Sequence, residues 1–425
     1  METTMPPIVT ENPEEVFGGC HIESWNAVST DSFPFYAEYK DWTKVRVTAV
    51  EGMFNGELRL ISALQYKEFC VVTMAHQDNR HIGKPMFCRY FDCKRREIPN
   101  TIYESFVFPL TAVHCPRRAG AKFMSLTFNA TDEITDMIPL EPRIFETHPH
   151  DIGVCVGQIY GEEKKWLQVL EFVEHHRILG ASMFYFTILE MDGYSKKVIE
   201  EYIRTGLAEA SFVHTEYATI NFLFHQIQLH ECFFRSKFHS KWVINADIDE
   251  RLVMEPGLSL TALLSYQNPF VCELIFSNRR VPKMNLTPQK YINDSHLIEN
   301  MEFLKYQMLE KHEWPAPKIV FQPEKVHNIF MHWSWRQHPG CRIVSIPHRI
   351  GYVRHYRFVN RDGLGANWLT GRKFEKSALE ANFSSQLTDA VRRKVHLLYA
   401  LKSIPCADIE PFFTNLYGND TLKCV

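Results

Sequence analysis

The chain has 425 residues, of which 45% are hydrophobic, so it is long enough for two or three domains and a large buried core. Its 47 Lys and Arg residues nearly balance its 50 Asp and Glu residues, which gives a formal net charge of −3. Because no tail or block carries charge of one sign, the composition excludes a general nucleic-acid-binding protein.

The N-terminal segment, residues 1–40, is rich in Pro, Ser, Thr, Asn and Glu, and this composition predicts a poorly structured segment without a core of its own. No basic stretch followed by an apolar stretch opens the chain, so we do not expect a signal peptide. Nowhere do about twenty apolar residues run together, so no membrane-spanning segment is predicted.

Residues 41–150 read as a small β-rich module. Short apolar runs alternate with Gly, Pro and Asn, and this texture favours antiparallel strands. The runs are "KVRVTAV" (44–50), "ELRLISALQ" (57–65), "FCVVTMA" (69–75), "YESFVFPL" (103–110) and "AKFMSLTF" (121–128).

Residues 151–360 alternate between strand and helix. We predict strands at 152–160, 182–190, 209–215 and 241–247, and helices at 161–180, 194–206 and 218–238. Four such alternations within roughly a hundred residues are typical of a parallel sheet with right-handed crossovers. Ligands of such sheets bind beyond the carboxyl ends of the strands. After residue 361 the chain reads as a helical C-terminal extension up to residue 425, with "LTDAVRRKVHLLYALKSI" (387–404) its clearest helix.

The predicted strand at 241–247 leads directly into the acidic triplet of Asp247, Asp249 and Glu250. In an extended backbone, residues two apart face the same side, so Asn245, Asp247 and Asp249 could line one edge while Ile248 points into the core. Two carboxylates at the mouth of a parallel sheet suit Mg²⁺ or Mn²⁺, which completes its coordination with water and substrate phosphate.

Other interpretations of this stretch remain open. A D-x-D triplet occurs about once by chance in a chain of this length, and acidic loops after strands often cap the next helix. "VHNIFMHWSW" offers His327 and His332 as further ligands, although a histidine in an aromatic stretch is more often structural. The basic clusters at 93–97 and 277–283 could bind phosphate or could be solvated loops.

The eleven cysteines show no CxxC pair, so a zinc site is not indicated. Their odd number leaves at least one free thiol or an intermolecular bridge. Asn-x-Ser/Thr sequons occur at Asn129, Asn285, Asn293, Asn382 and Asn419. Many cysteines together with several glycosylation acceptors favour an oxidising secretory compartment.

Four stretches, in order, resemble glycosyltransferase family 92, and in particular its nematode-type expansion. They are "KKWLQVLEFVEHHRILGASMFYFTILEMDGYSKKVIEEYIRTG", "QLHECFFRSKFHSKWVINADIDERL", "KIVFQPEKVHNIFMHW" and "VRHYRF". The resemblance runs from Cys155 to Phe358, with weaker similarity before it. It implies a GT-A-type, Rossmann-like nucleotide-sugar fold and inverting transfer of a sugar from a nucleotide donor. Characterised relatives are β1,4-galactosyltransferases that use UDP-galactose and Mn²⁺ and act on the core fucose of N-glycans.

The resemblance also implies site residues. Asp247 and Asp249 match the metal-binding pair of the family, Glu250 matches the acid after it, and His332 is our candidate for a third metal contact. Arg177 matches the first stretch, where it could bind the donor or serve as structural support. Family members are typically anchored in the Golgi through an N-terminal membrane helix, whereas this chain shows no such span.

Inverting transfer needs a general base near the acceptor hydroxyl. Glu273, in the apolar run "FVCELIF", is our candidate, although a buried carboxylate there could instead pair with Arg279 or Arg280. The main alternative for the whole chain is a catalytically silent glycan-binding protein of the same fold. A phosphohydrolase ranks last, because the chain shows no second acidic cluster that could hold a second ion.

Overall fold

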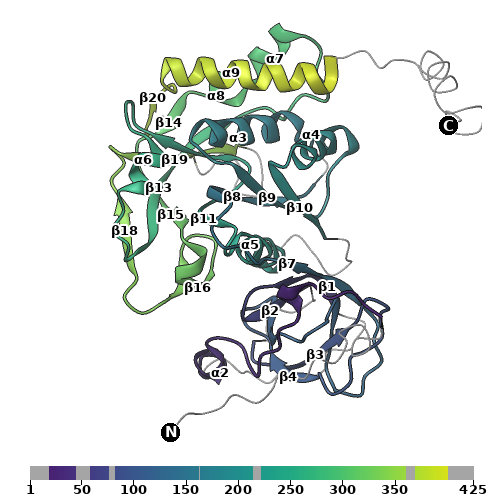
Figure 1. Ribbon diagram of the computed structural model, residues 1–425. Coiled ribbons are helices and arrows are strands. Elements are labelled where there is room, and N and C mark those ends of the chain that lie inside the picture. Colours follow the sequence, from purple (N-terminus) through teal and green to yellow (C-terminus); the bar gives the residue numbers. More distant parts are fainter. Residues whose placement is uncertain are drawn as a thin grey trace, which may run out of the picture.

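The computed structural model describes residues 19–44, 58–75, 82–161, 163–213, 222–359 and 369–400. Two sheets dominate it, a seven-stranded sheet near the N-terminus and a nine-stranded sheet built from the rest of the chain (Figure 1). The protein is therefore a mixed α/β protein, as predicted. The run predicted as a strand at 44–50 lies outside the described residues, except for Lys44, which ends a helix.

The N-terminal segment packs on the β-rich module. Its helical elements are η1 (Ser24–Asn26) and α2 (Tyr36–Lys44). Phe33 and Tyr39 are buried, and their rings lie 6.1 Å from Phe106 and 4.5 Å from Phe108, centroid to centroid. We predicted a poorly structured segment up to residue 40. Residues 19–40 are instead ordered against the module, a contact that composition does not reveal.

The seven strands of the β-rich module form a curled sheet in the order β4-β3-β6-β7-β1-β2-β5. They are β1 (Arg59–Gln65), β2 (Phe69–Ala75), β3 (Pro85–Phe91), β4 (Tyr103–Phe106), β5 (Ala112–Pro116), β6 (Phe123–Thr127) and β7 (Ile138–Pro142). Neighbours are antiparallel, as predicted, except that β1 and β7 are parallel. The two ends of the sheet meet, because the Ser105 hydroxyl on β4 donates to the His114 carbonyl on β5 (2.6 Å).

The nine-stranded sheet begins with four parallel strands in the order β10-β9-β8-β11 and continues as β15-β13-β19-β12, with β18 paired to β13. Its strands are β8 (His150–Ile159), β9 (Met183–Ile188), β10 (Ala208–Phe212), β11 (Ser240–Ala246), β12 (Glu250–Met254), β13 (Val271–Lys283), β15 (Trp314–Phe321), β18 (Arg342–Ile346) and β19 (Gly351–Phe358). The predicted parallel arrangement is confirmed for the first four strands. The strand order reverses between β8 and β11, and such a switch point is where open α/β sheets bind ligands.

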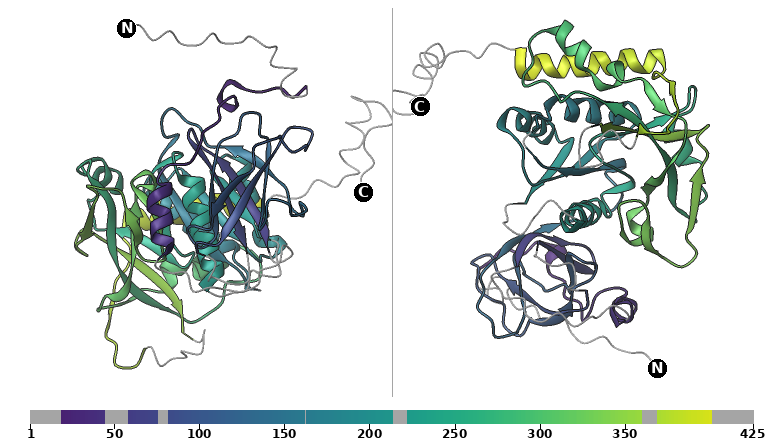
Figure 2. Two further views of the ribbon diagram at one scale, coloured as in Figure 1. Left: turned by 90° about the horizontal axis from the view of Figure 1, so that it is seen from below. Right: turned by 180° about the vertical axis from the view of Figure 1, so that it is seen from behind.

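Helices cover both faces of this sheet (Figures 1 and 2). The helices are α3 (Trp166–Ile178), α4 (Gly193–Arg204), α5 (Phe222–Ser236), α6 (Leu260–Ser265), α7 (Asp294–Asn300), α8 (Glu302–Lys305) and α9 (Ala381–Val395). Helices α3 and α4 lie on one face and α5 on the other, between the sheet and the β-rich module. Leu387, Val391 and Val395 of α9 belong to the same core as Phe172 of α3. Helix α9 is therefore part of this α/β layer and not a separate extension that begins at residue 361.

The remaining elements are short. They are β14 (Met308–Glu310) paired with β20 (Phe374–Lys376), β16 (Val326–Ile329) paired with β17 (Ser334–Gln337), η4 (Pro323–Lys325) and η6 (His396–Ala400). Within the described parts of the chain, no helix combines the length and the apolar character needed to cross a membrane.

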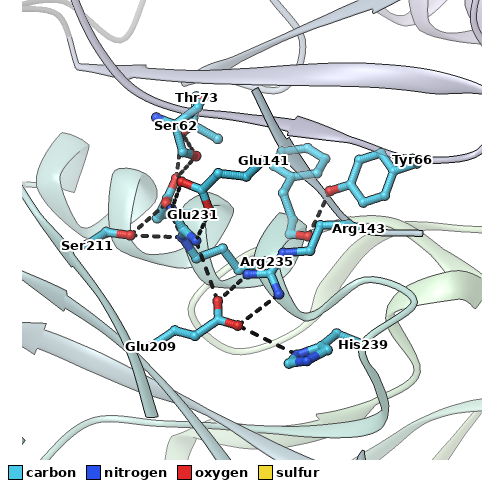
Figure 3. A network of polar contacts seen from close by, with 11 residues as sticks. Ser62, Tyr66, Thr73, Glu141, Arg143, Glu209, Ser211, Glu231, Arg235 and His239 are labelled. Atoms are coloured by element: carbon cyan, nitrogen blue, oxygen red, sulfur yellow. Dashed lines mark hydrogen bonds and ion pairs between the residues drawn. The ribbon is translucent and has the colours of Figure 1, made fainter. Parts of the chain in front are cut away.

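A buried carboxylate joins the two sheets (Figure 3). Glu231 of α5 is 1% exposed, and it accepts hydrogen bonds from Ser62 (2.8 Å) and Thr73 of the β-rich module. It also accepts from Ser211 of β10 (2.7 Å) and pairs with Arg235 (2.6 Å). A buried charge is tolerated when all of its lone pairs have partners of this kind. Glu231 thus fixes the module on the outer side of α5.

Four disulfides occur among the described residues, Cys20–Cys93, Cys88–Cys115, Cys155–Cys232 and Cys272–Cys341. Cys70 is a buried free thiol, which agrees with the odd cysteine count. Cys406 and Cys424 lie outside the described residues. The sequon asparagines Asn129, Asn285, Asn293 and Asn382 are all exposed, and Asn419 lies outside the described residues.

Candidate active site

A cavity of about 200 Å³ opens at the carboxyl ends of β8 and β11. It therefore lies at the switch point of the parallel strands, where a ligand site is expected. Its charged lining includes Glu163, Lys165, Asp247, Asp249, Lys283 and His355.

Both aspartates of the acidic triplet reach this cavity. Strand β11 ends at Ala246, and a tight turn follows in which the Asp247 carbonyl accepts from the Glu250 amide (2.8 Å). The prediction of an extended backbone through the triplet is therefore wrong, because a turn and not strand alternation brings the two carboxylates to one side. The Asp247 and Asp249 side chains are 28% and 33% exposed, so both are accessible to a ligand. Ile248 is buried in the core, as predicted.

The Asp247 carboxylate is held from several directions. Its Oδ2 atom accepts from the Lys318 ammonium on β15 (2.8 Å), and its Oδ1 atom lies 3.7 Å from Nε2 of His225 on α5. Gly157 on β8 passes so close that a Cβ atom there would overlap with Oδ1 and Cα of Asp247. A side chain at residue 157 would therefore displace the aspartate.

Asp249 pairs with a histidine of the neighbouring strand β19. Its Oδ2 atom lies 3.3 Å from Nε2 of His355, and its carbonyl accepts from the Tyr356 amide (2.8 Å). Burial alone would lower the pKa of His355, but the Asp249 and Glu250 carboxylates outweigh burial and raise it. Burial alone would likewise raise the pKa of Asp249, but His355 and the nearby lysines keep it below its usual value.

Glu250 supports the turn and does not line the cavity. It is 1% exposed. Its Oε2 atom accepts from the Asp247 amide (2.8 Å) and lies 3.0 Å from Lys318, while Oε1 accepts from Asn278 (3.0 Å). Burial raises the pKa of this carboxyl. Asn245, which we expected on the same edge, is also buried, and its side-chain amide donates to the Met331 carbonyl (3.2 Å).

Three basic side chains share the cavity with the aspartates. Lys283, Lys165 and Arg357 line the cavity, and Lys283 pairs with Glu302 (2.6 Å) and Glu163 (3.6 Å). Of the predicted basic cluster at 277–283, Lys283 is the residue that reaches the cavity. Arg279 pairs with Glu375 (2.7 Å), and Arg280 stacks on the Trp314 ring.

The structure does not bring Glu273 to the cavity. Glu273 on β13 pairs in register with Phe321, which also pairs with Val243 of β11. Glu273 is therefore level with Val243, which lies four positions before Asp247. This register separates Glu273 from Asp247 by about 13 Å along the strand direction. Its Oε2 atom accepts from the Ser334 amide (2.8 Å). The reason for the difference is strand register, which sequence spacing does not specify.

Arg177 and His332 also lie outside the cavity lining. Arg177 is nine residues beyond Gln168 on α3, roughly 14 Å along the helix axis, and it pairs with Glu174 (2.8 Å). His332 hydrogen-bonds through Nδ1 to the Pro317 carbonyl (2.9 Å). Within the described residues, no three His, Cys, Asp or Glu side chains form a ready-made metal site.

Several site residues were not singled out from the sequence, among them Gly157, Lys318 and His355. Each lies within a stretch already noted, since Gly157 is in the first strand after residue 151, Lys318 begins "KIVFQPEKVHNIFMHW", and His355 is the histidine of "VRHYRF". The stretches were informative, but which of their residues face the aspartates depends on strand pairing.

Together the features define an α/β protein with a cavity, lined by both acidic and basic side chains, where the strand order reverses. Residues 150–395 match the family described as Glycosyltransferase family 92. Because this match covers more than half of the chain, the chain belongs to glycosyltransferase family 92, and it is a glycosyltransferase by that membership. A comparison with curated proteins found no match.

Proposed function

We propose that the protein is a metal-dependent, inverting glycosyltransferase of GT-A type that transfers galactose from UDP-galactose to a glycan, with the core fucose of N-glycans as acceptor. The observation that carries this proposal is the pair of accessible carboxylates, Asp247 and Asp249, in one cavity at the β8–β11 switch point. The family resemblance supplies the donor and the acceptor.

The donor set of the cavity fits Mn²⁺ or Mg²⁺. Asp247 and Asp249 offer hard carboxylate oxygens, and His355 holds the Asp249 carboxylate from beside it. The two carboxylates would hold the ion without the predicted third contact from His332, whose Nδ1 atom bonds to the Pro317 carbonyl. They leave room for water and substrate phosphate, which Mg²⁺ and Mn²⁺ sites commonly retain. When bound, such an ion neutralises the charge of the diphosphate leaving group.

Basic side chains of the same cavity would also bind the donor. Lys283, Lys165 and Arg357 bring positive charge to the same cavity as the aspartates, and charged donors form strong hydrogen bonds to phosphate oxygens. The donor diphosphate would therefore meet the aspartate pair and these basic side chains in one cavity.

Glu163 is our candidate for the general base. Apart from the two aspartates, it is the carboxylate among the described lining residues, and its side chain is 16% exposed. A base must lie within hydrogen-bond reach of the acceptor hydroxyl, and Glu163 lines the cavity whereas Glu273 does not.

The proposal is tested by UDP release from UDP-galactose with Mn²⁺, with and without a fucosylated N-glycan. We expect acceptor-dependent release that EDTA abolishes and that Asp249→Asn removes with little change in melting temperature. Asp31→Asn, at an exposed aspartate of the N-terminal segment, is the matched control. Undiminished release by Asp249→Asn or in EDTA would exclude the mechanism, and glycan binding without any UDP release would favour the silent glycan-binding alternative.

We also infer that the protein works in the secretory pathway, in the Golgi lumen. Four disulfides and four exposed sequon asparagines support this location, because both features belong to oxidising compartments with glycosylation. Mass spectrometry after N-glycosidase treatment of the cellular protein would detect modified asparagines, and an unglycosylated, reduced protein would contradict the location.

A further inference from the structure

Lys318 is a buried lysine in the middle of the sheet. It lies on β15, where its neighbour Ile319 pairs with Asn245 of β11 and where it pairs with Phe276 of β13. Its side chain is 2% exposed. Lysine is rarely buried to this degree unless a carboxylate pairs with it, so its position requires an explanation.

Two carboxylates surround the Lys318 ammonium group. Its Nζ atom lies 2.8 Å from Oδ2 of Asp247 and 3.0 Å from Oε2 of Glu250. Each carboxylate is within hydrogen-bond distance of the ammonium group, so two negative groups balance this buried positive charge. Glu250 in turn accepts from the Asp247 backbone amide (2.8 Å), which closes a ring of three residues around the turn.

This ring decides how Asp247 faces the cavity. With Oδ2 directed at Lys318, the carboxylate plane is set, and Gly157 and His225 confine the Oδ1 side. Without the ammonium group, Asp247 and Glu250 would be adjacent negative groups in a largely buried environment and would repel each other. One of them would then rotate away or take up a proton.

We propose that Lys318 is a positioning residue of the donor site, whose ammonium group serves as a resident counter-ion that holds Asp247 in its ligand-binding orientation before any divalent ion arrives. This inference rests on the proposed function of the cavity and extends it. It implies that the free enzyme keeps its site formed without metal, and that Mn²⁺ alone adds little to its stability.

The test compares melting temperatures with and without Mn²⁺ for the wild type and two lysine variants. Lys318→Met removes the charge at similar volume, and we expect a lower melting temperature that Mn²⁺ largely restores, because the ion replaces the missing positive charge. The wild type should shift little with Mn²⁺ alone. The matched control is Lys237→Met, a buried lysine that donates to the Pro323 carbonyl (2.9 Å) near the opposite end of β11, and its loss of stability should not respond to Mn²⁺.

Equal destabilisation of Lys318→Met with and without Mn²⁺, as in Lys237→Met, would show a purely structural ion pair and overturn the inference. If Lys318→Met does not fold, Lys318→Arg retains the charge but changes its shape. We expect this variant to melt independently of Mn²⁺ and to bind UDP with Mn²⁺ about tenfold more weakly, and wild-type affinity would contradict positioning. If the wild type does not bind UDP with Mn²⁺, the proposed function fails, whereas the melting comparison still reports on Lys318.

Discussion

The Nε2 atom of His355 lies 3.3 Å from Oδ2 of Asp249, although 106 positions separate the two residues in the chain. Strands β12 and β19 bring them together, since Glu250 pairs with His355 in register. The contact orients one carboxylate of the cavity in the way that Lys318 orients the other. Residues that orient a metal ligand without touching the ion affect metal binding almost as strongly as the ligands themselves.

His355→Gln is therefore expected to lower the affinity for Mn²⁺ with UDP by about ten- to a hundredfold. Calorimetric titration would measure this affinity for Mn²⁺ with UDP. His348→Gln is the matched control, because His348 is 67% exposed and lies at a turn before β19. An unchanged affinity for His355→Gln would remove this histidine from the donor site.

Glu163→Gln is expected to lower kcat by about a hundredfold or more, the range that a general base contributes. Affinity for UDP with Mn²⁺ should change little, so the effect should appear in kcat and not in donor binding. Glu273→Gln is the comparison, since its carboxylate faces the Ser334 amide and not the cavity. A larger loss of kcat for Glu273→Gln than for Glu163→Gln would reverse our choice of base.

Glu231→Gln should destabilise the protein by about 2 kcal/mol, because the neutral amide weakens the charged hydrogen bonds from Ser62, Thr73 and Ser211, while Arg235 keeps its other carboxylate partners. Denaturation in urea, monitored by tryptophan fluorescence, would measure the change. Glu141→Gln is the milder control, since Glu141 also pairs with Arg235 (2.8 Å) but is 42% exposed. Equal stability of the two variants would mean that the junction in Figure 3 does not depend on Glu231.

Acid should unfold the protein through its buried histidines. Burial lowers the pKa of His114 from 6.5 to about 3, so the unfolded chain binds this proton at a higher pH than the folded protein does. The contribution of neutral His114 to stability is therefore complete above pH 6.5 and is lost progressively as the pH falls toward 3. His176 and His230 show the same shift.

His114→Phe should reduce this acid sensitivity, at a cost of about 1 kcal/mol at pH 7 for the lost hydrogen bond to the Phe108 carbonyl. Urea midpoints measured at pH 7 and pH 5 would test it. The exposed His348→Gln variant should keep the wild-type difference between the two pH values. If the urea midpoint of His114→Phe differs between pH 7 and pH 5 as much as that of the wild type, burial of His114 is not a cause of the acid sensitivity.

Much of the local structure follows from sequence pattern. Helix α3 ends with Gly180 shortly after it, and its apolar residues recur at helical spacing; β9, α4 and β11 were likewise placed within a few residues. Strand β3, by contrast, was not predicted. Its sequence "PMFCRYF" begins with a proline, and its polar and apolar residues alternate only weakly, so the local pattern does not predict a strand. Its pairing with β4 and β6 stabilises the extended conformation.

The sequence by itself determined that a pair of aspartates follows the fourth strand of a parallel α/β sheet, because periodicity and residue order are local properties. Tertiary structure alone decided which side chains face that pair. Lys318 contacts Asp247, and His355 contacts Asp249, through strand pairings that span 71 and 106 positions of the chain. Strand register places Glu273 outside the cavity, and its position near the far end of α3 places Arg177 outside it. The physical reason is that a one-residue change of register turns every side chain of a strand to the opposite face. The spacing of residues along the chain does not specify which register two distant strands adopt.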